Sequence, residues 1–219
     1  MDVVKTIWAG LDWSVLTDIL MRILPALLCI TLHEMGHGFA ALLMGDTTAR
    51  DMGRLSFNPL HHIDPMGLVM MVAFRFGWAK PVPINMYRFK DPKRGMALTA
   101  LAGPVTSVAL SALMLLLYGL LFPLRSDFLL SVVGTSAYLS LSLGVFNLLP
   151  VPPLDGSKVL FSLLSDEAYE TLMRYERYGM LLLVALLSTG ILSTPLSAVT
   201  EWLFDRLFVL AEWSYRLVS

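Results

Sequence analysis

The chain has 219 residues, of which 56% are hydrophobic and only 15% charged, and its formal net charge is −1. Soluble globular domains carry about 25% charged residues, so water is excluded as the surroundings of most of this surface. The near-zero charge, with basic residues scattered over several loops, also excludes nucleic acid as a partner. The composition predicts an integral membrane protein in contact with the lipid bilayer.

Four apolar segments are long enough to cross the hydrocarbon core of a bilayer, which is about 30 Å thick. We predict spans at about residues 14–45, 96–122, 128–149 and 179–196. The second and third carry small residues at four-residue spacing, which lets helix backbones approach closely in lipid. We therefore expect these two spans to pack against each other.

Two further segments differ from a full span. The apolar stretch 66–79 is short and contains Arg75, so we expect a re-entrant hairpin or partial helix. The stretch 197–218 repeats its charges on one helical face, which is typical of an amphipathic helix lying in the membrane interface. The predicted fold is mainly α: a polytopic membrane helix bundle in a single domain (1–219), with a short re-entrant or β-like segment near its functional site.

Basic residues indicate the orientation of the bundle. Ten of the 16 Lys and Arg residues lie in the loops 46–63, 80–94 and 157–177. By the positive-inside rule these loops face the cytoplasm. The C-terminal end of the first span then lies on the cytoplasmic side, and the N-terminus faces out.

The first predicted span contains the sequence His33-Glu34-Met35-Gly36-His37. Histidines four residues apart lie on one helical face about 6 Å apart, so their imidazoles can bind one zinc ion. Glu34 would then lie beside a metal-bound water, where a general base acts. Ionisable side chains in a membrane helix each cost about 2–3 kcal/mol to insert and usually line a functional site.

A catalytic zinc ion takes three protein ligands and keeps one position open for water, so one ligand is still to be found. The loops offer few candidates: His61, His62, Asp64 and Asp155. Asp155 is the best, because three prolines end the preceding span just before it, at the depth of the two histidines. A Leu-Asp-Gly turn is also an ordinary connection between two spans, so a structural role for Asp155 stays open.

Two other polar residues are candidates for binding substrate or supporting the transition state. Asn147, at the end of an apolar span, could donate to a substrate carbonyl or could simply cap the helix. His62 could stabilise the tetrahedral intermediate or orient Glu34. The plainer interpretation of His61 and His62 is a pair of surface-loop histidines. We expect His62 to matter more than His61, and neither to be required for zinc.

Taken together, these motifs resemble those of the site-2 protease family of intramembrane zinc metalloproteases. The resemblance rests on the histidine motif and on Asn147-Leu-Leu-Pro-Val-Pro-Pro-Leu-Asp155-Gly156, with support from 58–65, 77–83 and 102–104. It covers about residues 20–180 and is closest to the small bacterial or archaeal form, so we expect no PDZ or CBS domain. Ser107 stands where relatives often have asparagine after the Gly-Pro pair.

The resemblance implies that His33, His37 and Asp155 bind Zn²⁺, that Glu34 activates water and that Asn147 positions the scissile backbone. It implies a hydrolase: a zinc-dependent endopeptidase that cuts in or near a transmembrane segment of a membrane-bound substrate protein, the reaction of regulated intramembrane proteolysis. It also implies a multi-pass protein of a prokaryotic cell membrane, with the active site towards the cytoplasmic side. A homo-oligomer is compatible with the sequence.

A helical substrate hides its peptide bonds and has to unwind locally before it is cut. An extended segment of enzyme backbone could hold it by strand addition. The parts of the chain least able to form continuous helix are 66–87 and the proline-rich 150–153, so we expect the clamp in one of them.

Two other functions stay open on the sequence. A membrane metal transporter also places histidines in helices, but such folds usually repeat their motif in two halves, and this chain has one histidine motif. An inactive metal-binding scaffold would keep the ligands without turnover. Replacing Glu34 separates these functions, because transport or scaffolding should survive the change and proteolysis should not.

Overall fold

The computed structural model describes residues 13–74 and 79–219, and this part of the chain contains helices and no strand. The long helices are α2 (Trp13–Leu43), α5 (Pro92–Leu121), α6 (Asp127–Asn147) and α10 (Ser193–Arg216). The short helices are α3 (Thr48–Asp51), α4 (Pro65–Phe74), α7 (Asp155–Ser162), α8 (Asp166–Tyr175) and α9 (Gly179–Ser188). Single 3-10 turns are η1 (Pro59–His62), η2 (Met86–Arg88), η3 (Phe122–Leu124) and η4 (Glu176–Tyr178). The predicted mainly α fold is confirmed.

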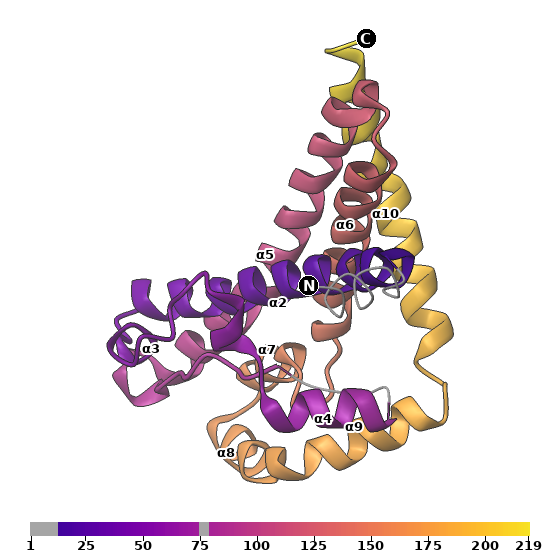
Figure 1. Cartoon of the computed structure of the whole chain (residues 1–219). Coiled ribbons are helices and arrows are strands. Elements are labelled where there is room, and N and C mark those ends of the chain that lie inside the picture. The colour runs from indigo at the N-terminus through magenta and orange to yellow at the C-terminus, as the bar shows by residue number, and fades with distance from the viewer. Residues whose placement is uncertain (1–12, 75–78) are drawn as a thin grey trace, which may run out of the picture.

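Within the described residues, three helices are long and apolar enough to cross a membrane, or four spans if a bent pair of helices is counted as one. These candidate spans are Ile23–Leu43, Pro92–Leu124 and Asp127–Asn147. They fall on α2, α5 and α6, where the sequence predicts the first three spans. In Figure 1, α5, α6 and α10 run side by side and α2 crosses them.

Small residues line the contact between α5 and α6. The buried small residues on these helices are Thr99, Gly103, Ser107 and Ser111 on α5 and Ser136, Ser140 and Gly144 on α6, and Gly144 faces Ser107 where the two helices meet. The Ser140 hydroxyl donates a hydrogen bond of 2.8 Å to the Ser107 carbonyl, which requires the two backbones to lie close together. The predicted packing of these two helices through small residues is confirmed.

The segment 179–196, predicted as a fourth span, is broken in the structure. α9 ends at Ser188, and α10 begins at Ser193 with its axis turned by 87°. Gly190 makes the turn with a φ of +69°, a conformation that glycine adopts without strain. The sequence is apolar on both sides of the break, so hydropathy alone predicts one continuous helix.

The C-terminal helix α10 packs lengthwise along α5 and α6. Phe208 lies against Tyr118 of α5 with ring centroids 6.2 Å apart, and Phe204 lies 5.4 Å from Tyr138 of α6. The helix predicted over 197–218 is present as part of α10, and in the structure it packs along the bundle (Figure 1). The amphipathic pattern identifies an apolar face, but not whether lipid or another helix covers it.

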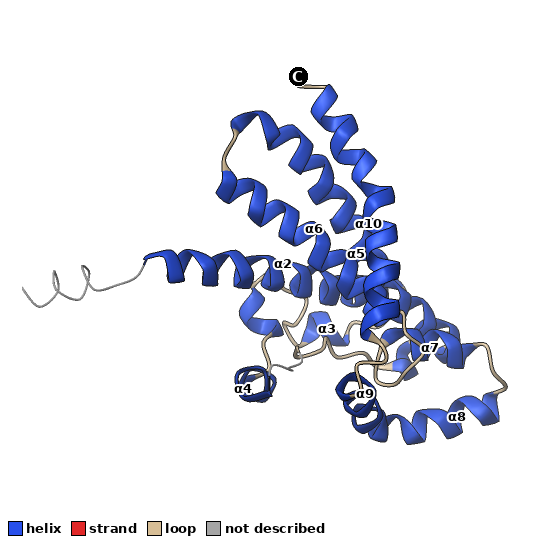
Figure 2. Ribbon diagram, turned by 90° about the vertical axis from the view of Figure 1, so that its right-hand side faces the viewer, coloured by secondary structure: helices blue, strands red, loops and turns tan. Residues whose placement is uncertain are grey.

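The segment predicted as re-entrant, 66–79, returns to the place where it starts. α4 forms its first part, and its last residues, including Arg75, lie outside the described residues. Ile63 and Ala79 form an antiparallel β-bridge, which is the β-like contact of this fold. Figure 2 shows α4 together with α7, α8 and α9 at the end of the molecule opposite to the C-terminus.

Candidate metal centre

Three donor atoms converge between α2 and the start of α7. The Nε2 atoms of His33 and His37 are 3.1 Å apart, and they lie 3.2 and 3.1 Å from Oδ2 of Asp155. All three residues are largely buried: the side chains of His33, His37 and Asp155 are 5, 8 and 12% exposed. The structure thus brings together the three residues in which the sequence predicts metal ligands, and this group could hold one metal ion.

The path of the chain after α6 explains how Asp155 reaches the histidines. α6 ends at Asn147, and the proline-rich turn that follows leads directly into α7, of which Asp155 is the first residue. Gly156 allows this tight turn, because a Cβ there would overlap with the Leu148 carbonyl. Burial opposes ionisation of Asp155, but hydrogen bonds to the two histidines outweigh it and hold the pKa of this carboxyl below its usual range.

The second ring nitrogen of each histidine faces α5. His37 Nδ1 lies 2.8 Å from the Thr99 carbonyl oxygen, so this nitrogen carries the proton and donates it to a hydrogen bond. His33 Nδ1 lies 2.9 Å from Oγ of Ser107. In a neutral imidazole with its proton on Nδ1, the lone pair of Nε2 is free, so each ring could exchange its Nε2 hydrogen bond to Asp155 for a bond to a metal ion. The donor set therefore fits a metal ion in its geometry and its ligand types.

The closest approach of α5 to the histidines is at Gly103. A Cβ at this position would overlap with the His37 ring and would lie 2.8 Å from Nε2 of His33. The absence of a side chain is what lets α5 approach the two rings and supply their hydrogen-bond partners.

Glu34 lines the same cavity as the three donors. This cavity has a volume of about 540 Å³ and is lined mostly by apolar side chains of α2, α5, α6, α9 and the segment 79–84. Oε2 of Glu34 accepts a hydrogen bond of 2.8 Å from the Val82 N–H. The structure thus places a carboxylate beside the candidate metal site, in a pocket with room for a peptide segment.

Comparison with known proteins defines the family. A model of "Peptidase family M50" matches residues 123–189. "Putative zinc metalloprotease YwhC" of Bacillus subtilis strain 168 is 32% identical over 187 residues, which cover 82% of this chain and 83% of YwhC. The chain belongs to peptidase family M50.

Other relatives are also named as zinc metalloproteases. "Putative zinc metalloprotease Rip2" of Mycobacterium tuberculosis strain H37Rv is 32% identical over 88% of this chain and 74% of its own length. "Putative zinc metalloprotease MJ0611" of Methanocaldococcus jannaschii is 32% identical over 60% of this chain and 69% of its own length. No solved structure gives a significant match. The resemblance to the site-2 proteases is confirmed: this M50 chain is a protease and a multi-pass integral membrane protein.

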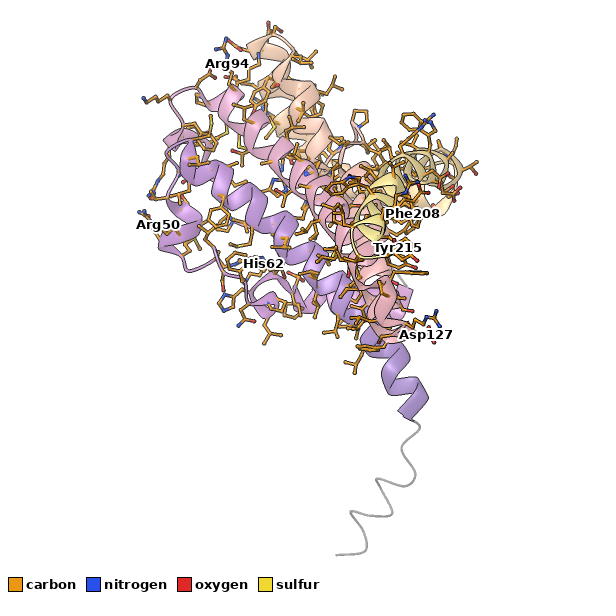
Figure 3. All side chains as sticks on the ribbon, turned by 90° about the horizontal axis from the view of Figure 1, so that it is seen from above. Arg50, His62, Arg94, Asp127, Phe208 and Tyr215 are labelled. Atoms are coloured by element: carbon orange, nitrogen blue, oxygen red, sulfur yellow. The ribbon has the colours of Figure 1, made fainter. Side chains whose placement is uncertain are left out.

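Asn147 and His62 differ in their relation to the M50 site. Asn147 lines the cavity, and its Nδ2 donates a 2.9 Å hydrogen bond to the Leu143 carbonyl of its own helix. His62 is buried with Nε2 2.8 Å from the Ser56 carbonyl oxygen, and it is not among the residues described as lining the cavity. In Figure 3, His62 lies on one flank of α2 and α5 lies on the other. The geometry thus gives His62 no direct contact with the metal site.

The cavity wall of this M50 chain also contains an ion pair that the sequence motifs do not predict. Nζ of Lys158 lies 3.8 Å from Oε1 of Glu176, and both residues line the cavity. Lys158 follows Asp155 by three residues, about one helical turn, which is the signal that could have identified it. Glu176 lies in a turn far along the chain and carries no such signal.

Ser107→Ala should weaken metal binding by this M50 chain about 10- to 100-fold, because it removes the partner that orients His33. Titration of zinc against a competing chelator measures the change. Ser111→Ala is the matched control: Ser111 is also buried on α5, but its hydroxyl has no hydrogen-bond partner. Equal affinities for the two variants would contradict an orienting role for Ser107.

Proposed function

We propose that this chain is a zinc-dependent endopeptidase that hydrolyses a peptide bond in or near a transmembrane segment of a membrane-bound substrate protein. One observation carries the proposal: the donor atoms of His33, His37 and Asp155 converge in the wall of an apolar cavity that also holds Glu34. The names of the relatives indicate which metal binds, since they describe zinc metalloproteases. A cavity between membrane helices supports a substrate that is itself in the membrane.

His33, His37 and Asp155 are the residues that would hold zinc. Two imidazole nitrogens and one carboxylate oxygen are a usual ligand set for catalytic zinc, and they leave one position for water. Bound there, zinc supplies a water of lowered pKa and polarises the scissile carbonyl.

Glu34 is the general base in this proposal. Its carboxylate takes a proton from the attacking water and later gives that proton to the nitrogen of the leaving amine, so that one water is consumed for each peptide bond broken. Asn147, in the same cavity, lies where its amide can donate to the backbone of an unwound substrate. His62 acts at most indirectly, through the loop that it holds.

The substrate has to be extended before its peptide bonds are accessible, and both predicted clamp segments contribute to the cavity. Pro153 comes from the proline-rich turn, and Ala79, Val82 and Ile84 come from the segment after α4. The basic loops of this chain support a site that opens towards the cytoplasm, in the cell membrane of a prokaryote.

The decisive test compares the wild type with Glu34→Gln. We expect cleavage to fall by about 100- to 10,000-fold, the usual contribution of a positioned base, while zinc stays near one ion per chain. Proteomics of membrane-protein fragments in cells that express either form finds the substrates, and metal analysis of the purified proteins gives the zinc content. If the same fragments appear with Glu34→Gln as with the wild type, they do not come from catalysis by this site; the assignment is then refuted, and a metal transporter or an inactive scaffold takes its place.

A further inference from the structure

The segment 79–83, which we call the strap, runs in extended form past the cavity and is held by hydrogen bonds to other parts of the chain. Its Lys80 N–H donates to the His62 carbonyl at 2.9 Å. Nη2 of Arg54 donates to the carbonyl oxygens of Lys80 and Pro81, both at 3.1 Å. The Val82 N–H donates to Glu34 at 2.8 Å. The strap therefore connects Arg54, which is not among the described cavity-lining residues, with the proposed base.

One peptide group makes this connection. The peptide unit between Pro81 and Val82 contains both the carbonyl that accepts from Arg54 and the N–H that donates to Glu34. Hydrogen bonds arranged in such a chain polarise one another. The guanidinium on one side therefore strengthens the donor that faces the carboxylate on the other side.

Between residues 81 and 83, the strap has no main-chain N–H other than that of Val82 to donate to Glu34. Pro81 and Pro83 have no N–H, so Val82 supplies the single main-chain donor of the three residues 81–83. The two proline rings also fix the backbone on either side, and the Val82 side chain is 4% exposed. The direction of this N–H is thus set by the strap as a whole.

Arg54 differs from its basic neighbours in what it binds. Arg50 and Arg88 pair with Asp51, whereas Arg54 has no ion pair among those of the described residues. Its hydrogen bonds to other segments go to the two strap carbonyls instead. A guanidinium that donates hydrogen bonds to backbone carbonyl oxygens can hold a loop in a fixed position.

We infer that Arg54 is a positioning residue for the catalytic base: through the Pro81–Val82 peptide it holds the Glu34 carboxylate in its working orientation. The inference rests on the proposed role of Glu34. It predicts that loss of Arg54 affects the chemical step rather than the binding of zinc or of substrate. The strap is then a part of the catalytic machinery that carries no catalytic side chain of its own.

The test measures cleavage in proteoliposomes. The substrate is a single-span membrane protein whose fragments were found in cells that express the wild type. Arg54→Ala should lower kcat about 10- to 100-fold, as expected for loss of an orienting partner, with KM and zinc content unchanged. Arg54→Lys should recover part of kcat, since a lysine retains the charge but not the planar fork. Arg50→Ala is the matched control and should behave as the wild type, because Arg50 lies on the adjacent helix α3 and is exposed.

Hydrogen exchange provides a readout that does not depend on activity. Arg54→Ala should increase deuterium uptake of a peptide that contains 79–84, and Arg50→Ala should not. If Arg54→Ala fails to fold, Val82→Pro tests the same link from the other side, because it removes the N–H that faces Glu34 and keeps a buried apolar ring. Val82→Pro should show the same loss of kcat with zinc retained.

The outcomes separate this inference from the proposed function. Wild-type kcat in Arg54→Ala or in Val82→Pro, together with an inactive Glu34→Gln chain, overturns the inference alone. In Arg54→Ala, a loss of activity that comes with lost zinc or a raised KM also overturns it, because Arg54 would then support the site as a whole. An active Glu34→Gln chain overturns the proposed function and the inference together.

Discussion

Gly103→Ala should deprive this protease of its metal and lower cleavage about 1,000-fold, the loss expected when several kcal/mol of metal assistance disappear. The new Cβ would occupy the space of the His37 ring and would press on Nε2 of His33. The rings cannot turn away freely, because Thr99 and Ser107 of the same helix hold their Nδ1 atoms. Metal analysis of the purified variant and the proteoliposome cleavage assay measure the two losses.

Gly134→Ala is the control for this change. Gly134 lies on α6, where a Cβ would meet the Tyr118 ring at 3.4 Å, an ordinary van der Waals contact. This variant should keep zinc and activity. Full zinc occupancy and normal cleavage in Gly103→Ala would show that α5 does not approach the histidines as closely as the structure has it.

Asp155→Ala should lower zinc occupancy well below one ion per chain. It should reduce cleavage about 1,000-fold, as in Gly103→Ala. The two histidines alone leave the metal with too few protein ligands. Their Nε2 atoms would also face each other at 3.1 Å without the carboxylate oxygen that both of them contact. Zinc titration and cleavage of the same substrate give both numbers.

Asp64→Ala is the matched comparison, since Asp64 is another acid that follows a turn near the membrane. Its Oδ1 accepts a 2.8 Å hydrogen bond from the Gly67 N–H at the start of α4, so its loss should cost about 1 kcal/mol of stability. Zinc should be retained and activity affected less than in Asp155→Ala. If the two variants behave the other way round, the third ligand belongs to the segment 58–65.

The sequence determined the helices and the central motif because both depend on local periodicity. Hydropathy predicts the spans that became α2, α5 and α6, and the spacing of His33 and His37 on one helical turn predicts that their rings meet. The prolines before Asp155 indicate that the chain turns there. Local periodicity predicts neither the break after α9 nor which helices α10 packs against.

Only the tertiary structure determined what surrounds the motif. The partners of His33 and His37 are a hydroxyl and a carbonyl of α5, more than 60 residues away, and the need for glycine at position 103 appears only when two helices meet. The link from Arg54 to Glu34 passes through a backbone peptide, and no residue type in the sequence marks that peptide group. Contacts of this kind depend on distances between segments that the chain brings together only by folding, so a sequence pattern names the catalytic side chains but not the groups that hold them.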